Sequence, residues 1–161
     1  MSFVALPSRC EPIDPTPEPQ GLITNDGFFP DLDPEEMRLL ANVSTSITPK
    51  ALRGALVAAI ITVGRDLRAW AEAQQAAGYP TLNAVPATRI DGVSVHLQQY
   101  RRAVALFAKA ELIERQRDFD TTAAGGKDLE ELGESIGDLR RDALHAVRDI
   151  LARSRTIIEL I

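Results

Sequence analysis

The most regular hydrophobic pattern in the chain lies near its C-terminal end, between residues 127 and 153. Apolar residues recur there at alternating intervals of three and four positions, at Leu129, Leu132, Ile136, Leu139, Ala143, Ala146 and Ile150. This spacing places all of them on one face of an α-helix and is typical of a seam between packed helices. The pattern therefore predicts a helix over residues 127–153, which begins after the break at Gly125 and Gly126.

A second apolar stripe predicts a long helix over residues 49–77. Thr48 and Pro49 form a typical helix start, and Gly78 is suited to end the helix. The stripe between them again uses intervals of three and four, at Leu52, Leu56, Ala59, Val63, Leu67 and Trp70. Gly54 and Gly64 each weaken a helix by about 1 kcal/mol relative to alanine. We therefore expect close packing or a kink at these two glycines.

Two further helices are predicted from similar patterns. Asp33 followed by Pro34 is a capping residue and a first-turn proline, so a short helix should run over residues 34–41. Residues 79–89 contain Pro80 and Pro86 and form an irregular connection. A third long helix should then open at Asp91-Gly92-Val93-Ser94 and reach about residue 117, with an apolar stripe at Leu97, Tyr100, Val104 and Phe107.

These elements predict an all-α fold. Aromatic residues make up only 5% of the 161-residue chain, so the core must be built mainly from Leu, Ile, Val and Ala packed between helices. We expect one domain over residues 34–153, an antiparallel helical bundle of three long helices plus the short N-terminal helix.

The two ends of the chain look different from this domain. Residues 1–33 are rich in proline and acidic residues, and are expected to form an extended or disordered arm without its own core. The arm is either a leader without a role or a segment that orders on a neighbouring subunit. At its end lie Phe28 and Phe29. The C-terminal tail, residues 154–161, should dock on its own bundle or on a neighbour. The expected partner contacts in these two segments are Phe28, Phe29, Ile157, Ile158, Leu160 and Ile161.

The sequence offers little for catalysis, cofactors or metal binding. Its single cysteine, Cys10, cannot support a disulfide framework or a cysteine-based zinc site. Its two histidines, His96 and His145, lie in no catalytic or metal-ligand motif. The longest apolar run, residues 55–63, is far shorter than the roughly 20 residues of a membrane span. We therefore expect a protein that is not an enzyme and has no cofactor, no metal and no membrane partner.

The distribution of charge along the chain does not favour nucleic-acid binding. The net charge is −5, but acidic residues are concentrated before residue 37 and the remainder is mildly basic. The densest basic pairs, Arg101-Arg102 and Arg140-Arg141, have no interleaved aromatic residues for base stacking. We expect ion pairing within or between subunits, with Arg140 and Arg141 among the partner contacts. A helical nucleic-acid-binding packaging or regulatory protein remains the alternative.

Taken in order, several short stretches resemble the head-completion protein family of contractile-tailed temperate phages. They cover roughly residues 28–161, and their order and spacing carry the resemblance more than any single one. The stretches are Phe28-Phe29-Pro30-Asp31-Leu32-Asp33-Pro34, Ala76-Ala77-Gly78-Tyr79, Val85-Pro86-Ala87, Ile90-Asp91-Gly92, Tyr100-Arg101-Arg102-Ala103-Val104, Glu114-Arg115 and Arg141-Asp142.

The resemblance implies a structural virion protein of the head-to-tail connector class. Such a protein would dock on the portal vertex after DNA packaging, stabilise the filled head and provide the platform for tail joining. Similarity to other connector adaptors implies a dodecameric ring on the head. The implied partners are further copies of the chain, the portal protein and a tail-side connector or tail terminator protein. Packaged DNA would pass through the ring without specific binding. The implied location is the head–tail junction of the virion, after assembly in the host cytoplasm.

Overall fold

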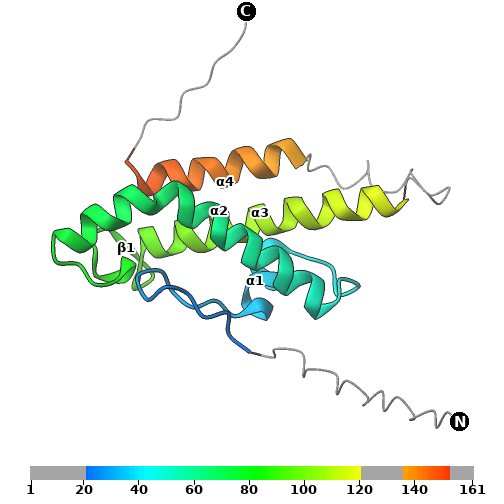
Figure 1. Ribbon diagram of the computed structural model, residues 1–161, viewed down its shortest axis with the longest axis horizontal. Helices are drawn as coiled ribbons and strands as arrows, with labels where there is room; N and C mark the ends of the chain where they lie inside the picture. Colours follow the sequence, from blue (N-terminus) through cyan, green and yellow to red (C-terminus); the bar gives the residue numbers. More distant parts are fainter. Residues whose placement is uncertain (1–20, 121–135, 153–161) are drawn as a thin grey trace, which may run out of the picture.

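The computed structural model describes residues 21–120 and 136–152, and it describes the side chains of residues 21–116 and 136–152. Its fold is mostly helical, as expected (Figure 1). Two short strands form an antiparallel pair between α2 and α3. The elements in chain order are α1 (Pro34–Ala41), α2 (Pro49–Ala76), the 3-10 turn η1 (Leu82–Ala84), β1 (Arg89–Ile90), β2 (Val93–Ser94), α3 (Val95–Asp120) and α4 (Ile136–Ile150).

Helix α3 is the central element of this arrangement. It packs against both α2 and α4, which contact each other only slightly, and α1 lies against α3 and α2. Figure 1 shows α4 running alongside α3, with α1 on the other side of the molecule. The larger buried side chains between these helices are mostly aliphatic, and Leu52, Leu56, Val63, Leu67, Val104 and Ile150 are all covered.

The predicted starts of α1 and α2 are confirmed by their caps. The Asp33 carboxylate accepts a hydrogen bond from the Glu35 amide at 2.9 Å. The Thr48 hydroxyl accepts one from the Ala51 amide at 3.3 Å. In both cases a proline follows the cap, so the first turn of each helix loses no needed donor.

The predicted stop of α2 at Gly78 is also confirmed. Gly78 has φ +94°, a left-handed conformation that glycine adopts without strain. Its amide donates to the Gln75 carbonyl at 2.9 Å, and the Tyr79 amide donates to the Gln74 carbonyl at 3.1 Å. These two bonds form a Schellman motif and satisfy carbonyls that the helix end leaves free.

The predicted start of α3 at Asp91 was wrong. Asp91 and Gly92 form instead the two-residue turn of a β-hairpin, with φ +53° and +73°. Ile90 pairs with Val93 across this turn, and Arg89 pairs with Ser94. An Asp-Gly pair favours this turn because both central positions need positive φ. The helix begins at Val95 and extends to Asp120, past the predicted end.

The apolar seam of the last helix is confirmed where the structure describes it. Leu139, Ala143, Ala146 and Ile150 are buried, as is Val147 beside them, while Ile136 at the start of the helix is half-buried. The described helix runs over Ile136–Ile150, while Leu129 and Leu132 lie outside the described residues. The expected bundle of three long antiparallel helices therefore stays a prediction.

The boundary predicted between arm and domain at residue 33 needs correction. Ile23 and Leu32 form an isolated β-bridge, with amide-to-carbonyl distances of 2.7 and 3.0 Å. Both side chains are buried in the same core as the helices. The packed unit therefore begins before α1 and includes residues 23–33. Residues 1–20 and the tail at 154–161 lie outside the described residues.

Candidate assembly surfaces

Phe28 and Phe29, expected to contact a partner, lie instead in the core of their own chain. Their exposed fractions are only 3% and 5%. The Phe29 ring stacks on the ring of Tyr100 in α3, with centroids 4.8 Å apart and planes inclined by 11°. Phe28 packs edge-on against Trp70 in α2, at 6.3 Å between centroids. The expectation is corrected because α2 and α3 already cover both rings.

Polar groups of the same segment fix these rings in place. One Asp26 carboxylate oxygen accepts hydrogen bonds from the amides of Phe28 and Phe29, both at 3.0 Å. The Asn25 side-chain amide donates to the Tyr100 hydroxyl at 2.8 Å. Burial raises the pKa of Tyr100 to about 12, against the opposing effect of the Asn25 hydrogen bond. Tyr100 is therefore a neutral core residue at physiological pH.

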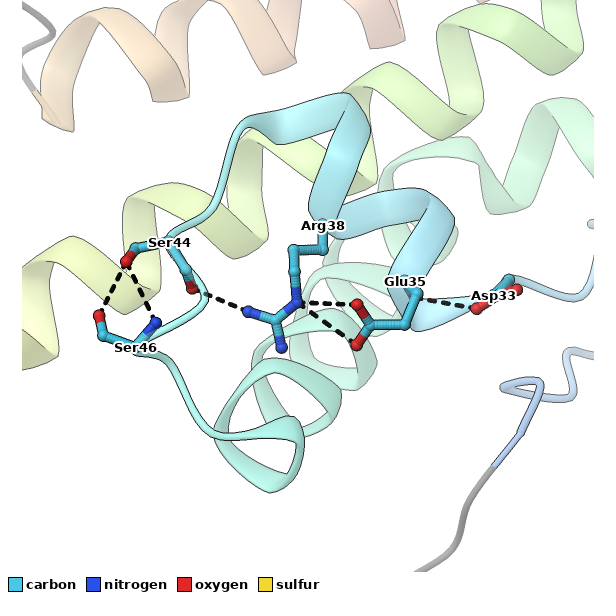
Figure 2. A network of polar contacts seen from close by, with 5 residues as sticks. All are labelled: Asp33, Glu35, Arg38, Ser44 and Ser46. Carbon is cyan, nitrogen blue, oxygen red and sulfur yellow. Dashed lines mark hydrogen bonds and ion pairs between the residues drawn. The ribbon is translucent and has the colours of Figure 1, made fainter.

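A buried arginine joins α1 to the loop before α2, as Figure 2 shows. The Arg38 Nε donates to the Glu35 carboxylate at 3.0 Å, and Nη1 donates to the Ser44 carbonyl at 2.8 Å. Arg38 is 7% exposed, so its charge needs these partners. The Ser44 hydroxyl also lies 2.8 Å from that of Ser46 within the loop. This network ties α1 to the loop that follows it.

Arg140 and Arg141 both lie on the exposed side of α4 and make ion pairs within the chain. Arg140 binds Glu114 of α3 at 2.6 Å, and Arg141 binds Asp138 of α4 at 2.7 Å. The expected ion pairing within the subunit is therefore present. Their expected contacts with a partner stay a prediction.

The two histidines lie in different surroundings. The His96 ring packs edge-on against Trp70 at 5.5 Å, and burial lowers the pKa of His96. The His145 ring nitrogen lies 4.0 Å from the Asp142 carboxylate one turn earlier on α4. Within the described residues, no cluster of three or more potential ligands is placed to hold a metal ion. No helix in those same ranges is long and apolar enough to cross a membrane.

Exposed aliphatic residues were missed from the sequence. Leu39 and Leu40 of α1 point outward, with Leu39 81% exposed, and Val57 and Ile61 of α2 do the same, with Ile61 66% exposed. All four lie outside the buried stripes of their helices. Large aliphatic residues outside the predicted apolar stripe are the sequence signal that could have identified them. The tail residues Ile157, Ile158, Leu160 and Ile161 lie outside the described part of the chain.

Comparison with known proteins places the chain in a family. A family model described as phage head completion protein (GPL) matches residues 23–161. The head completion/stabilization protein of Escherichia phage P2 is 36% identical over 148 residues, covering 90% of this chain and 88% of that protein. The probable head completion/stabilization protein of Haemophilus phage HP1 is 27% identical over 143 residues, covering 87% and 92%. No solved structure matches the chain.

Proposed function

Because the chain belongs to the family of phage head completion proteins, we propose that it docks on the portal vertex of a DNA-filled head. There it stabilises the head and provides the platform for tail joining. The role requires binding and not catalysis, so we propose that the chain is not an enzyme. The observation that carries the proposal is the match over residues 23–161, which includes nearly every described residue.

The proposed assembly is a dodecameric ring around the portal channel. Its partners are neighbouring copies, the portal protein and a tail-side connector or tail terminator protein, and DNA passes through without specific binding. The exposed aliphatic residues of α1 and α2 support an assembling protein, because such side chains gain most when another surface covers them. A ring also multiplies weak contacts, since every copy bound raises the effective concentration of the others.

The decisive experiment compares phage heads assembled with and without this protein. We expect heads that lack it to lose packaged DNA, measured as DNase-sensitive DNA, and to fail to join tails. Electron microscopy of complete heads should show added density at the portal vertex. Heads that keep their DNA and join tails equally well without the protein would contradict the proposal.

A binding measurement separates this proposal from a role in DNA recognition. We expect weak binding to duplex DNA at physiological salt, because the chain carries a net charge of −5 and ring passage needs no grip on phosphates. Binding tighter than about micromolar, with a steep loss as salt rises, would instead indicate a nucleic-acid-binding protein.

A further inference from the structure

The outer faces of α1 and α2 are both apolar but differ in character. On α1, Leu39 and Leu40 share the exposed side of the helix with Glu35 and Glu36, and we call these four residues the α1 patch. Residues three and four apart are neighbours on a helix, so each leucine lies beside a carboxylate. The buried side of α1 is formed by Met37, Arg38 and Ala41.

On α2, the outer face is a row of small and branched residues. Gly54, Val57, Ile61 and Gly64 follow each other at intervals of three, four and three, and we call them the α2 patch. The buried stripe of the helix, which includes Leu56 and Val63, faces away from them.

The two glycines of the α2 patch contact no other element in the described part of the chain. Glycine is a poor helix former, and we had expected close packing or a kink at these positions. A Cβ added at Gly54 or Gly64 would meet no other atom within 4 Å in the described chain. Close packing against residues 21–116 or 136–152 of the same chain therefore does not account for them. A backbone without side chains does allow another element to approach closely from outside.

Charge makes the two patches complementary. The α1 patch carries Glu35 and Glu36, which pair with Arg38 and Arg101 of the same chain. Both glutamate side chains remain more than half exposed, whereas Arg38 is buried and the Arg101 side chain is 31% exposed, so the outer side of α1 stays acidic. The α2 patch has Arg65 and Arg68 exposed along its outer side, with Glu72 one turn further on. Arg65 lies 3.8 Å from the Asp66 carboxylate, but its side chain stays 69% exposed. Two α1 patches would bring carboxylates together and two α2 patches would bring guanidinium groups together. Unlike patches avoid both arrangements.

We propose that the α1 patch of one copy packs on the α2 patch of a second copy of this chain. Leu39 and Leu40 lie over Val57 and Ile61 between the two glycines, and the carboxylates of α1 face the arginines of α2. When two copies pair through unlike patches, one copy still has a free α1 patch and the other a free α2 patch. Further copies can therefore add at both ends, and the chain of copies can close into a ring. The inference rests on the proposed function in one respect, that copies assemble on the head.

Cysteine cross-linking tests this pairing directly. In a Cys10→Ser background, Leu39→Cys and Ile61→Cys are made in separate copies, and the two are mixed during head assembly. A short bismaleimide is then added to purified heads and to the free protein at high concentration. We expect a cross-linked dimer in the mixture and none with either variant alone. A chain carrying both cysteines should give a ladder of longer products.

The matched control is the mixture of Ile90→Cys and Leu144→Cys, two other exposed aliphatic residues, which should give no dimer. Dimers from Leu39→Cys alone would overturn the proposal, because they require two α1 patches to meet. A product that joins Ile61→Cys to a different head protein would overturn it as well. If the mixture gives no dimer on heads that do carry the protein, the pairing is wrong while the proposed function stands. If the protein is absent from heads, the proposed function fails. The pairing is then decided by the free protein, where a mixture without dimer overturns it.

Discussion

Residues 21–33 and helix α4 are both attached to the α2–α3 pair, but by different kinds of contact. The N-terminal segment packs two phenylalanine rings against Trp70 and Tyr100, and the Asn25 side chain donates a hydrogen bond to the Tyr100 hydroxyl. Helix α4 lays a regular row of aliphatic residues, two of them alanines, on α3, with ion pairs such as Arg140 to Glu114 along the exposed edge.

Residues 21–33 are thus anchored at one point, whereas α4 is attached along the whole seam that it forms with α3. A few large rings carry the attachment of the segment, so the loss of one should be severe. Along the seam, the attachment is shared among many contacts, and the helices can approach closely because Ala143 and Ala146 are small. Adding volume at the seam should therefore do more harm than removing a charge at its edge.

The largest expected effect is at the anchor of the N-terminal segment. Phe29→Ala should lower the free energy of unfolding by about 3–5 kcal/mol, because it removes a buried ring and leaves a cavity against Tyr100. Urea denaturation followed by circular dichroism measures this. The matched control is Leu22→Ala in the same segment, whose side chain is exposed and whose loss should change little. A loss below about 1 kcal/mol for Phe29→Ala would contradict anchoring at a point.

Overpacking the seam should have the next largest effect. Ala143 is fully buried between α4 and α3, and Ala143→Leu should destabilise the protein by about 1–3 kcal/mol because the added side chain has no space. The neighbouring exposed position offers the control, since Leu144→Ala should leave the unfolding midpoint nearly unchanged. If Ala143→Leu were tolerated as well as Leu144→Ala, the helices would not be closely packed there.

Tyr100 should make the stability of the N-terminal anchor depend on pH. Its pKa is raised from an ordinary value of 10 to about 12 in the folded protein. A raised pKa means that its stabilising contribution is complete below pH 10 and is lost as pH rises towards 12, by up to about 1.4 kcal/mol per pH unit. Tyr100→Phe lacks this loss but also lacks the hydrogen bond from Asn25, worth about 1 kcal/mol. The wild type should therefore be the more stable protein at pH 8 and lose its advantage by pH 11–12. Urea titrations of both proteins across this range would show a constant difference if the expectation is wrong.

The smallest expected effect is at the edge of the seam. A double-mutant cycle of Arg140→Gln and Glu114→Gln should give a coupling of about 0.2–1 kcal/mol, because both side chains are half exposed. The coupling should shrink when unfolding is repeated in 0.5 M salt, since salt screens exposed charges. A coupling that is large and insensitive to salt would mean that the ion pair, and not the apolar row, holds α4.

The seam could be predicted from the sequence, whereas the anchor could not. Helix caps such as Asp33 and Thr48 act on residues two or three positions away, and the α4 row repeats at short intervals, so both are visible locally. The contact of Asn25 with Tyr100 joins residues 75 positions apart. No local pattern indicates such a contact, and the proline-rich, acidic surroundings of Phe28 and Phe29 favoured an unpacked arm.

Two other errors have local causes. Asp91-Gly92 was predicted to open a helix, but an Asp-Gly pair favours the two-residue turn of a hairpin because both central positions need positive φ. The exposed aliphatic residues of α1 and α2 were not recognised as candidate contact residues. Periodicity identifies the face that is buried and says nothing about what covers the other face.

The Arg38 network has a consequence for the entropy of association. An isolated eight-residue helix would be only marginally formed in water. Arg38, paired with Glu35 of the same helix, ties α1 to the Ser44 carbonyl of the following loop, so the helix is held in place before any partner arrives. Ordering a loose helix on contact would subtract from the binding free energy of every copy. With the helix already fixed, that cost falls on the folding of each subunit, and none of it recurs at the successive contacts of an assembly.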